Sequence, residues 1–223
     1  MIVAIDGPAG AGKSTVARSV AAALGLRFLD TGAMYRAVTK VVLDRGIDPN
    51  DGPACGDVAA GLVLAFDADG RILINGDPGE PAIRAQDVTG AVSAVSAHPE
   101  VRRAVVPLQR MEGERGHGIV AEGRDIGTVV FPDADHKFFL TASSRERARR
   151  RAAQDGREDE VAALQAEIER RDELDTTRAD SPLKQASDAI AVDTDRLDLA
   201  GVVQRVLEAI RQRASTESGE VRS

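Results

Sequence analysis

The residues near the N-terminus have the types and spacing of a phosphate-binding loop. Residues 7–14 read Gly-Pro-Ala-Gly-Ala-Gly-Lys-Ser and match G-x-x-x-x-G-K-[ST] at every fixed position. Glycines permit positive φ, so successive N–H groups can surround an anion. In such a loop Lys13 reaches the β- and γ-phosphates of ATP, and the Ser14 hydroxyl is a ligand of Mg²⁺. The expected ATP-binding residues are Gly7, Pro8, Ala9, Gly10, Ala11, Gly12, Lys13, Ser14 and Thr15.

A second group of residues is suited to binding another phosphate. Guanidinium groups bind phosphate through two parallel hydrogen bonds. The transition state of phosphoryl transfer spreads negative charge over equatorial oxygens, so cations and positioning supply most of the catalysis. Transfer to an acceptor that is itself a phosphate needs no strong base, which agrees with the presence of only three histidines in the sequence. The arginines that could hold it are Arg36, Arg102, Arg124, Arg171 and Arg178.

These residues must be positioned by an α/β framework. Residues 2–5 form a short β-branched run, as in a buried parallel strand, and an apolar helical stripe begins at Val16. The expected fold is therefore α/β, with a parallel sheet flanked by helices. Apolar patterns predict further strands at 26–29, 118–121, 137–141 and 189–192, and a hairpin at 62–74. Helices are expected at about 33–45, 83–97, 100–114, 145–153, 161–171 and 199–210, and residues 49–56 as a loop.

The residues that carry chemistry fall where predicted strands end. The phosphate-binding loop follows the first strand, Asp30 and Thr31 follow the second, and Glu122, Arg124 and Asp125 follow the third. Ligands of parallel α/β sheets bind at the carboxyl ends of the strands. We therefore expect one site there.

Composition excludes several classes of protein. The chain has 223 residues with a net charge of −7, which argues against binding nucleic acid. No run of 18 apolar residues occurs, so we expect no membrane span. Asp6 interrupts the apolar start, so we expect no signal peptide, and a single cysteine fits the cytoplasm.

Five motifs together resemble the bacterial cytidylate kinase family, over residues 1–213. The most specific reads Glu-Gly-Arg-Asp-Ile-Gly-Thr-Val-Val-Phe-Pro-Asp, from Glu122 to Asp133. The others are the phosphate-binding loop, Asp-Thr-Gly-Ala-Met-Tyr-Arg at 30–36, Ile-Arg-Ala-Gln-Asp-Val at 83–88 and Arg-Asp-Glu-Leu-Asp-Thr-Thr-Arg at 171–178. This resemblance implies a P-loop kinase fold and Mg²⁺-dependent transfer of the ATP γ-phosphoryl group to CMP or dCMP.

The resemblance also implies individual roles. Arg36, Arg124 and Arg178 would hold the acceptor phosphate, Asp175 and Arg171 the sugar, and Ser93, Arg102 and Asp125 the cytosine. Thr31 would bind substrate where the family often has serine, and Glu122 is a second residue considered for Mg²⁺. The implied catalytic residues are Lys13, Arg124, Arg178, Arg147 and Arg151.

The chemistry of cytosine supports the base assignment independently. Cytosine presents an N4 donor beside N3 and O2 acceptors, which match a carboxylate such as Asp125 and a guanidinium such as Arg102. Uracil reverses this pattern, so a buried pair of these residues favours cytosine. The alternative is that Arg124 and Asp125 simply form an ion pair within a loop.

Five arginines lie within residues 145–151. They fit either a solvated helix face or a lid that closes over ATP and neutralises developing charge. Arg147 and Arg151 are one helical turn apart, which favours a lid contribution from both.

The resulting organisation is a single kinase domain over 1–213, expected to be a monomer. Its core comprises 1–30, 115–142 and 186–213. The nucleoside-monophosphate (NMP) region is about 31–114, with a β insert at about 62–84; the lid is about 143–180, and 214–223 form a flexible tail. Kinases for UMP, AMP or shikimate remain alternatives, as does a regulatory switch. The absence of any Asn-Lys pair counts against a guanine-binding switch.

Overall fold

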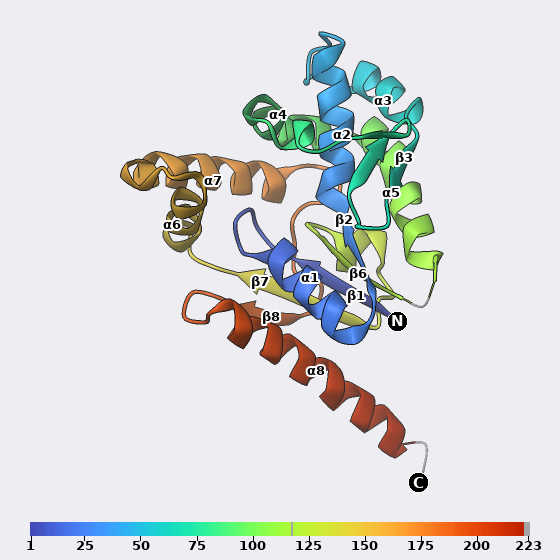
Figure 1. Ribbon diagram of the computed structural model, residues 1–223, viewed down its shortest axis with the longest axis vertical. Coiled ribbons are helices and arrows are strands. Elements are labelled where there is room, and N and C mark those ends of the chain that lie inside the picture. Colours follow the sequence, from blue (N-terminus) through green and yellow to red (C-terminus); the bar gives the residue numbers. More distant parts are fainter. Residues whose placement is uncertain (117, 221–223) are drawn as a thin grey trace.

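The structure, a computed structural model, describes residues 1–116 and 118–220. Five parallel strands form the central sheet in the order β2-β6-β1-β7-β8 (Figure 1). Val3, Ala4 and Ile5 in the middle strand are fully buried, because neighbours cover both faces. The predicted parallel sheet is thus confirmed. Its strands are β1 (Ile2–Asp6), β2 (Arg27–Asp30), β6 (Ile119–Gly123), β7 (His136–Thr141) and β8 (Ile190–Asp193).

The register brings the chemically active strand ends together. In the parallel ladders Asp30 of β2 lies beside Glu122 of β6, and Asp6 of β1 lies beside Gly123. The loops that follow β1, β2 and β6 therefore leave the sheet at one edge. That edge carries the site.

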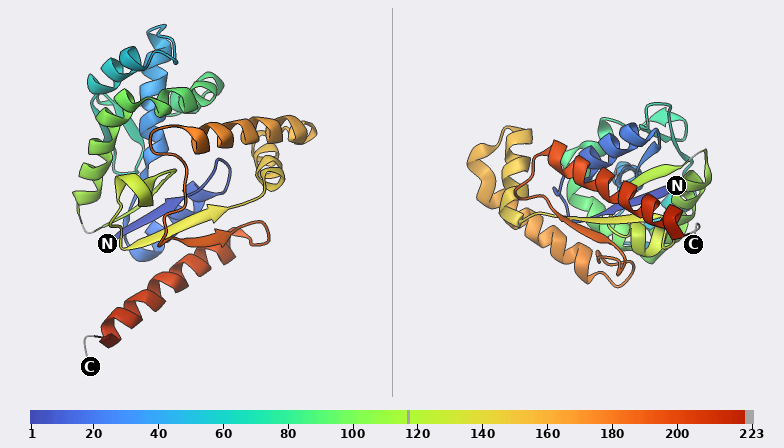
Figure 2. Two further views of the ribbon diagram at one scale, coloured as in Figure 1. Left: turned by 180° about the vertical axis from the view of Figure 1, so that it is seen from behind. Right: turned by 90° about the horizontal axis from the view of Figure 1, so that it is seen from below.

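Helices cover both faces of this sheet. On one face, α1 (Lys13–Leu24) and α8 (Leu199–Glu220) share an apolar core with β1 and β7. On the other, a five-residue π-helical segment, η2 (Ile126–Val130), packs against β2 and β6. Figure 2 shows α8 running along the sheet and beyond its end. The tail predicted from residue 214 is helical as far as Glu220; the rest of that prediction lies outside the described residues.

The NMP region forms a second body with its own core (Figure 1). A three-stranded antiparallel sheet lies within it and provides the β insert. Because the helices pack on one another and on this insert, the region can present side chains to the main sheet as a unit. Its elements are α2 (Thr31–Asp44), α3 (Gly52–Ala60), β3 (Leu64–Phe66), β4 (Ile72–Ile74), β5 (Asp77–Pro78), the 3₁₀ turn η1 (Ala82–Arg84), α4 (Gln86–Ala97) and α5 (Pro99–Glu114).

The loop expected at 49–56 is wrong, because α3 begins within it. The side chain of Asp51 accepts a hydrogen bond from the Ala54 N–H at 3.0 Å and caps the helix. Pro53 is tolerated because the first turn of a helix has no N–H partners to lose. Cys55 then packs into the core at 0% exposure.

The lid forms a third, smaller unit. It consists of α6 (Ser144–Asp155), the 3₁₀ turn η3 (Glu158–Glu160) and α7 (Val161–Thr177). Ser143 caps α6 by accepting from the Glu146 N–H. Ala148, Ala152, Leu164 and Ile168 form a small core between the two long helices. Figure 1 shows this pair standing to one side of the sheet, with α7 reaching toward α4. No helix in the described part of the chain has the length and apolar character needed to cross a bilayer.

Candidate active site

The donor side of the site is built from main chain. At Gly7 a Cβ atom would lie 2.2 Å from the Leu140 carbonyl oxygen, so a side chain would collide with backbone there. Gly12 has φ 85° and precedes α1 without providing a side-chain cap. The first N–H groups of α1 therefore remain available to an anion, as in other helix N-terminal phosphate sites.

Lys13 and Ser14 lie in the wall of the resulting cavity. Lys13 is 6% exposed, and its ammonium group donates to the Pro8 carbonyl at 2.8 Å. Burial, with the nearby Arg124 charge, lowers the pKa of Lys13 to about 7. The Ser14 hydroxyl donates to Glu122 at 2.5 Å, and burial raises the pKa of that carboxyl group. A bound anion would therefore stabilise the charged form of Lys13.

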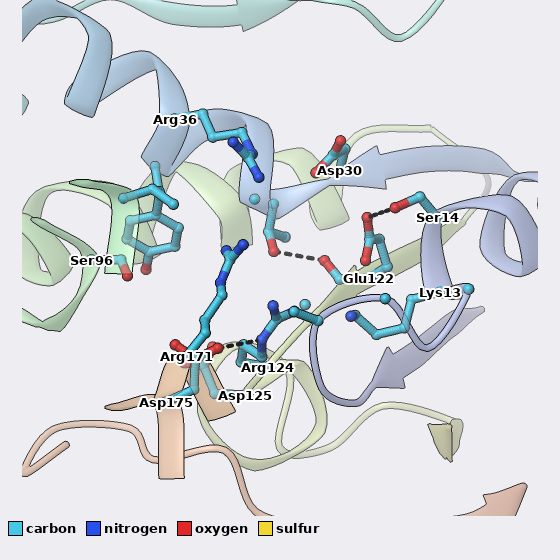
Figure 3. Close-up of a pocket in the computed structure, with 18 of the residues that line it drawn as sticks. Lys13, Ser14, Asp30, Arg36, Ser96, Glu122, Arg124, Asp125, Arg171 and Asp175 are labelled. Atoms are coloured by element: carbon cyan, nitrogen blue, oxygen red, sulfur yellow. Dashed lines mark hydrogen bonds and ion pairs between the residues drawn. The ribbon is translucent and has the colours of Figure 1, made fainter. Parts of the chain in front are cut away.

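A cavity of about 430 Å³, which we name the acceptor pocket, opens beside the donor loop (Figure 3). Nine cationic and four acidic side chains line it, which leaves an excess of five positive charges in a protein of net charge −7. Such a concentration of charge attracts phosphates. The cations are Lys13, Arg36, Arg84, Arg102, Arg124, Arg150, Arg151, Arg171 and Arg178, and the acids are Asp30, Glu122, Asp125 and Asp175.

Three predicted arginines meet at the centre of this pocket. Arg124 donates from Nε to Asp175 Oδ2 at 2.8 Å. Arg171 Nε and Arg178 Nη2 are buried with no hydrogen-bond partner among the described residues. Burial, with the Arg124 charge, lowers the pKa of Arg171 to about 10. Unpaired buried donors are costly unless a ligand accepts their hydrogen bonds, so this cluster is suited to an anionic ligand.

Arg36 enters the same space from α2, as Figure 3 shows. Its Nη1 donates to Thr89 Oγ1 at 2.8 Å. Burial, with the Arg84 charge, lowers the pKa of Arg36 to about 10. Arg84 lines the pocket as well and donates to Asp30 Oδ2 at 2.7 Å. The two arginines extend the cationic surface to the NMP region.

A buried ion pair forms part of the pocket wall. Arg102 is 3% exposed, and its Nη2 donates to Asp125 Oδ2. Arg178 Nη2 lies 3.6 Å from the other oxygen of that carboxylate. The Arg102 guanidinium carbon lies 5.4 Å from the centre of the Tyr35 ring, and burial raises the pKa of the Tyr35 hydroxyl. The pair presents a carboxylate and guanidinium groups together in the wall of the cavity.

Asp6 holds the Arg124–Asp125 turn against the donor strand. Its two carboxylate oxygens accept from the Ile126 N–H at 2.8 Å and the Gly127 N–H at 2.7 Å. Burial raises the pKa of Asp6 to about 6, while the two backbone hydrogen bonds oppose this shift. The last residue of β1 therefore links the loop that begins at Gly7 to the acceptor residues.

The two lid arginines have different surroundings. Arg147 is 5% exposed; its Nη1 donates to the Ala9 carbonyl at 2.9 Å, and its Nη2 pairs with Asp172 at 2.6 Å. Arg151 lines the acceptor pocket and pairs with Asp155 at 2.6 Å. In this conformation Arg147 braces the donor loop against α7, whereas Arg151 faces the cavity.

Most predicted site residues come together in this pocket, and Ser93 does not line it. Val92 and Ser96 of the same helix line it, because residues four apart lie on one face of a helix. Ser93 is rotated about 100° from Val92 around the helix axis and so points away from this face. Thr31 lines the pocket and donates to the Glu122 carbonyl at 2.6 Å. Of the predicted ATP-binding residues, those in the wall are Ala9, Gly10, Gly12, Lys13, Ser14 and Thr15, whereas Gly7, Pro8 and Ala11 lie outside it.

Four residues that contribute to the site were given no individual role by the sequence, although Asp30 was expected at one of the strand ends that carry it: Asp6, Asp30, Tyr35 and Arg84. Asp30 and Tyr35 lie in the motif at 30–36, and Arg84 lies in the motif at 83–88. The motifs therefore pointed to these positions without indicating what each side chain does. For Asp6, the only indication in the sequence is that it directly precedes the phosphate-binding loop. Their partners lie far away in the chain, which is why spacing could not reveal them.

The donor set fits a magnesium ion that also binds substrate phosphates. Ser14 and Glu122 offer two hard oxygen ligands within hydrogen-bonding distance of each other. The described residues include no group of three or more His, Cys, Asp or Glu side chains arranged for a metal. Mg²⁺ commonly uses one or two protein ligands, with phosphates and waters completing its octahedron.

Comparison with known proteins adds a family. The family model described as cytidylate kinase matches residues 3–212. A cytidylate kinase of Mycobacterium leprae is 50% identical over 217 residues, covering 96% of this chain and 97% of the relative. One of Rhodococcus opacus is 49% identical and covers 96% of each chain. A bifunctional pantoate ligase/cytidylate kinase of a Synechococcus species is 50% identical; it covers 97% of this chain, but the chain spans only 46% of its length.

Solved structures support the fold alone. A gluconokinase from Sinorhizobium meliloti superposes with a TM-score of 0.54 at 15% sequence identity, covering 98% of this chain and 95% of the other. The arrangement of sheet, loop and flanking helices is therefore that of P-loop kinases.

Proposed function

The chain belongs to the cytidylate kinase family, and on that premise we propose that it transfers the γ-phosphoryl group of ATP to CMP or dCMP. The observation that carries this proposal is the acceptor pocket. Beside a phosphate-binding loop it gathers eight arginines and four carboxylates, a formal excess of four positive charges, and its wall includes a buried carboxylate–guanidinium pair. Two anionic phosphates and one base therefore each have a matching surface.

Donor and acceptor would bind at opposite ends of the cavity. The N–H groups of the loop and Lys13 hold the ATP phosphates, and Arg36, Arg124 and Arg178 hold the phosphate of CMP. An oxygen of that phosphate attacks the γ-phosphorus as the bond to the β–γ bridging oxygen breaks, and ADP leaves. No general base is required, because the attacking oxygen is already anionic. Positioning and positive charge supply the rate enhancement.

Arg102 and Asp125 would select the base. Asp125 accepts from the cytosine N4 amino group, and Arg102 donates toward N3 and O2. Uracil would place an acceptor against the carboxylate, leaving buried polar groups unpaired. Asp175 and Arg171 would hold the sugar, with Thr31 and Ser93 as further substrate-binding residues.

Ser14, with Glu122, would hold Mg²⁺. When bound, the ion neutralises charge on the β- and γ-phosphates. Arg151 lies where it can reach the transferred group when the lid closes, and Arg147 ties the lid to the donor loop at Ala9. Closure would exclude water and so limit ATP hydrolysis.

We further propose that the protein acts as a monomer in the cytoplasm, in pyrimidine nucleotide metabolism, without nucleic-acid or membrane partners. The net charge of −7 supports the absence of nucleic acid.

One assay tests the proposed activity. ADP release from ATP and Mg²⁺ is followed with CMP, dCMP, UMP, AMP and shikimate as separate acceptors. We expect rapid release with CMP and dCMP and much slower release with the other three. ATP hydrolysis that no acceptor accelerates would contradict the proposal.

A further inference from the structure

Ser181 has a backbone conformation that serine rarely adopts. It follows α7, before β8, with φ 49° and 9% exposure. Among the described non-glycine residues only Asn75 also has positive φ, and Asn75 lies in an exposed turn of the β insert where such a residue is common. For a buried serine this conformation costs free energy, and such strain persists where surrounding contacts enforce it.

The contacts that enforce it belong to the acceptor pocket. Arg102 Nε donates to Ser181 Oγ at 3.0 Å, and that hydroxyl donates onward to Asp180 Oδ1 at 2.5 Å. Arg178 Nε donates to the Ser181 carbonyl at 2.6 Å. One residue thus fixes the Nε edges of two arginines, one from α5 and one that follows α7.

The Nη2 atoms of the same two arginines lie next to the Asp125 carboxylate. Arg102 Nη2 is hydrogen-bonded to Asp125, and Arg178 Nη2 lies 3.6 Å from it without forming a hydrogen bond. Each guanidinium is therefore held between Ser181 on one side and Asp125 on the other. A guanidinium is planar, so fixing its Nε sets the direction of its remaining donors.

We propose that Ser181 is a positioning residue that sets base selectivity, by fixing the orientation of Arg102 and, through its carbonyl, coupling Arg102 to Arg178. This inference rests on the proposed function, in which Arg102 reads the base and Arg178 holds the acceptor phosphate. Its chemistry is that of a buried hydroxyl, which accepts from Arg102 and donates to Asp180. Without it, the Arg102 Nε keeps only the Asp180 carboxylate, 3.5 Å away, and the guanidinium is held less firmly in the geometry that distinguishes cytosine from uracil.

The decisive variant is Ser181→Gly, because glycine adopts positive φ without strain and removes only the hydroxymethyl group. We expect a folded protein with an unchanged or raised Tm, a KM for CMP raised about tenfold, and a ratio of kcat/KM for CMP over UMP lowered about tenfold. The KM for ATP and the kcat with saturating CMP should change less than about threefold, because the donor side is untouched. Asn75→Gly is the matched control and should leave all kinetic values unchanged.

Ser181→Ala distinguishes the contribution of the hydroxyl from that of the backbone conformation. It keeps the costly conformation and removes the hydroxyl, so it should show the same loss of selectivity with a lower Tm than Ser181→Gly. A CMP-over-UMP ratio within twofold of wild type in Ser181→Gly would overturn the proposal. So would equal losses in the kinetic values for ATP and CMP, which indicate general damage. Failure of the proposed function itself is seen separately, as wild-type protein that does not accelerate ADP release with CMP.

Discussion

The donor and acceptor sides of the pocket are built differently. The donor side is a contiguous loop whose N–H groups would bind phosphate in the proposed function, with Lys13 as the loop's cationic side chain. The acceptor side consists of arginine side chains from several elements, which are held by carboxylates and carbonyls. Backbone donors need only the loop conformation. Side-chain donors point in the required direction only when the distant residues that hold them are also in place.

The two sides are therefore sensitive to substitution in different ways. A substitution on the donor side removes chemistry and leaves the fold, because few contacts depend on the changed side chain. A substitution on the acceptor side also leaves a buried partner without its opposite charge, which costs stability. Variants on each side test that contrast.

Lys13→Ala should lower kcat about a thousandfold or more, because the ammonium no longer stabilises charge on the transferring group. Its Tm should not fall, because burial already lowers the pKa of Lys13 to about 7 and its charge is costly in the free protein. Steady-state kinetics and thermal melts measure the two effects. Lys40→Ala, which removes an exposed pair with Asp44, is the control and should leave turnover intact. Wild-type turnover in Lys13→Ala would refute the role of the loop.

Arg124→Ala should lower kcat/KM for CMP by about a hundredfold, with little change in the KM for ATP. It should also destabilise the fold by about 3–5 kcal/mol, because Asp175 is left buried without its partner. Adding Asp175→Asn should restore part of the Tm and none of the activity. Arg103→Ala, on the exposed face of α5, is the control. If Arg124→Ala were as stable as wild type, the contrast between the two sides would be wrong.

Asp125→Asn should lower the CMP-over-UMP ratio of kcat/KM by about tenfold to a hundredfold, because the amide can present either a donor or an acceptor to the base. The Tm should fall too, since Arg102 and Arg178 both face this carboxylate. Competition between CMP and UMP in one assay gives the ratio directly. A ratio equal to that of wild type would remove Asp125 from base selection.

The same contrast explains what could be predicted from sequence. The donor loop is contiguous, so its residues, its strand and its helix are all visible in one segment. Asp30 and Arg84 are 54 residues apart and form an ion pair that no spacing rule contains. The role of Ser93 is implied only by the family resemblance, whereas the phase of α4 places Val92 and Ser96 in the pocket wall.

Other differences between the sequence prediction and the structure arose where one local pattern is compatible with two structures. Asp-Gly-Pro at 51–53 is typical of a turn, yet the same residues cap and begin α3. The strain at Ser181 has no sequence signature, because serine is common in loops and only the contacts of Arg102 and Arg178 give it a role. Side-chain networks of this kind depend on tertiary packing, which periodicity does not describe.

Asp6 joins the two sides, and its titration is expected to act on stability more than on rate. The pKa of Asp6 is about 6 in the folded protein, above the ordinary value of 3.8, because the carboxylate is buried. The folded state therefore binds this proton more tightly than the unfolded state between pH 3.8 and 6. The resulting stability is fully present below pH 3.8 and is lost as the pH rises through 6, with a total of about 3 kcal/mol.

Asp6→Asn removes that dependence and keeps one oxygen acceptor for the turn at Ile126. The unfolding free energy of wild type minus that of Asp6→Asn should therefore decrease between pH 4.5 and 7, as measured by urea denaturation at each pH. The variant should also raise the KM for CMP more than the KM for ATP, because the turn it loosens carries Arg124 and Asp125, whereas the donor loop keeps its own backbone contacts. Parallel stability profiles for the two proteins would show that Asp6 is not titrating in this range, and equal changes in both KM values would show that it supports the two sides alike.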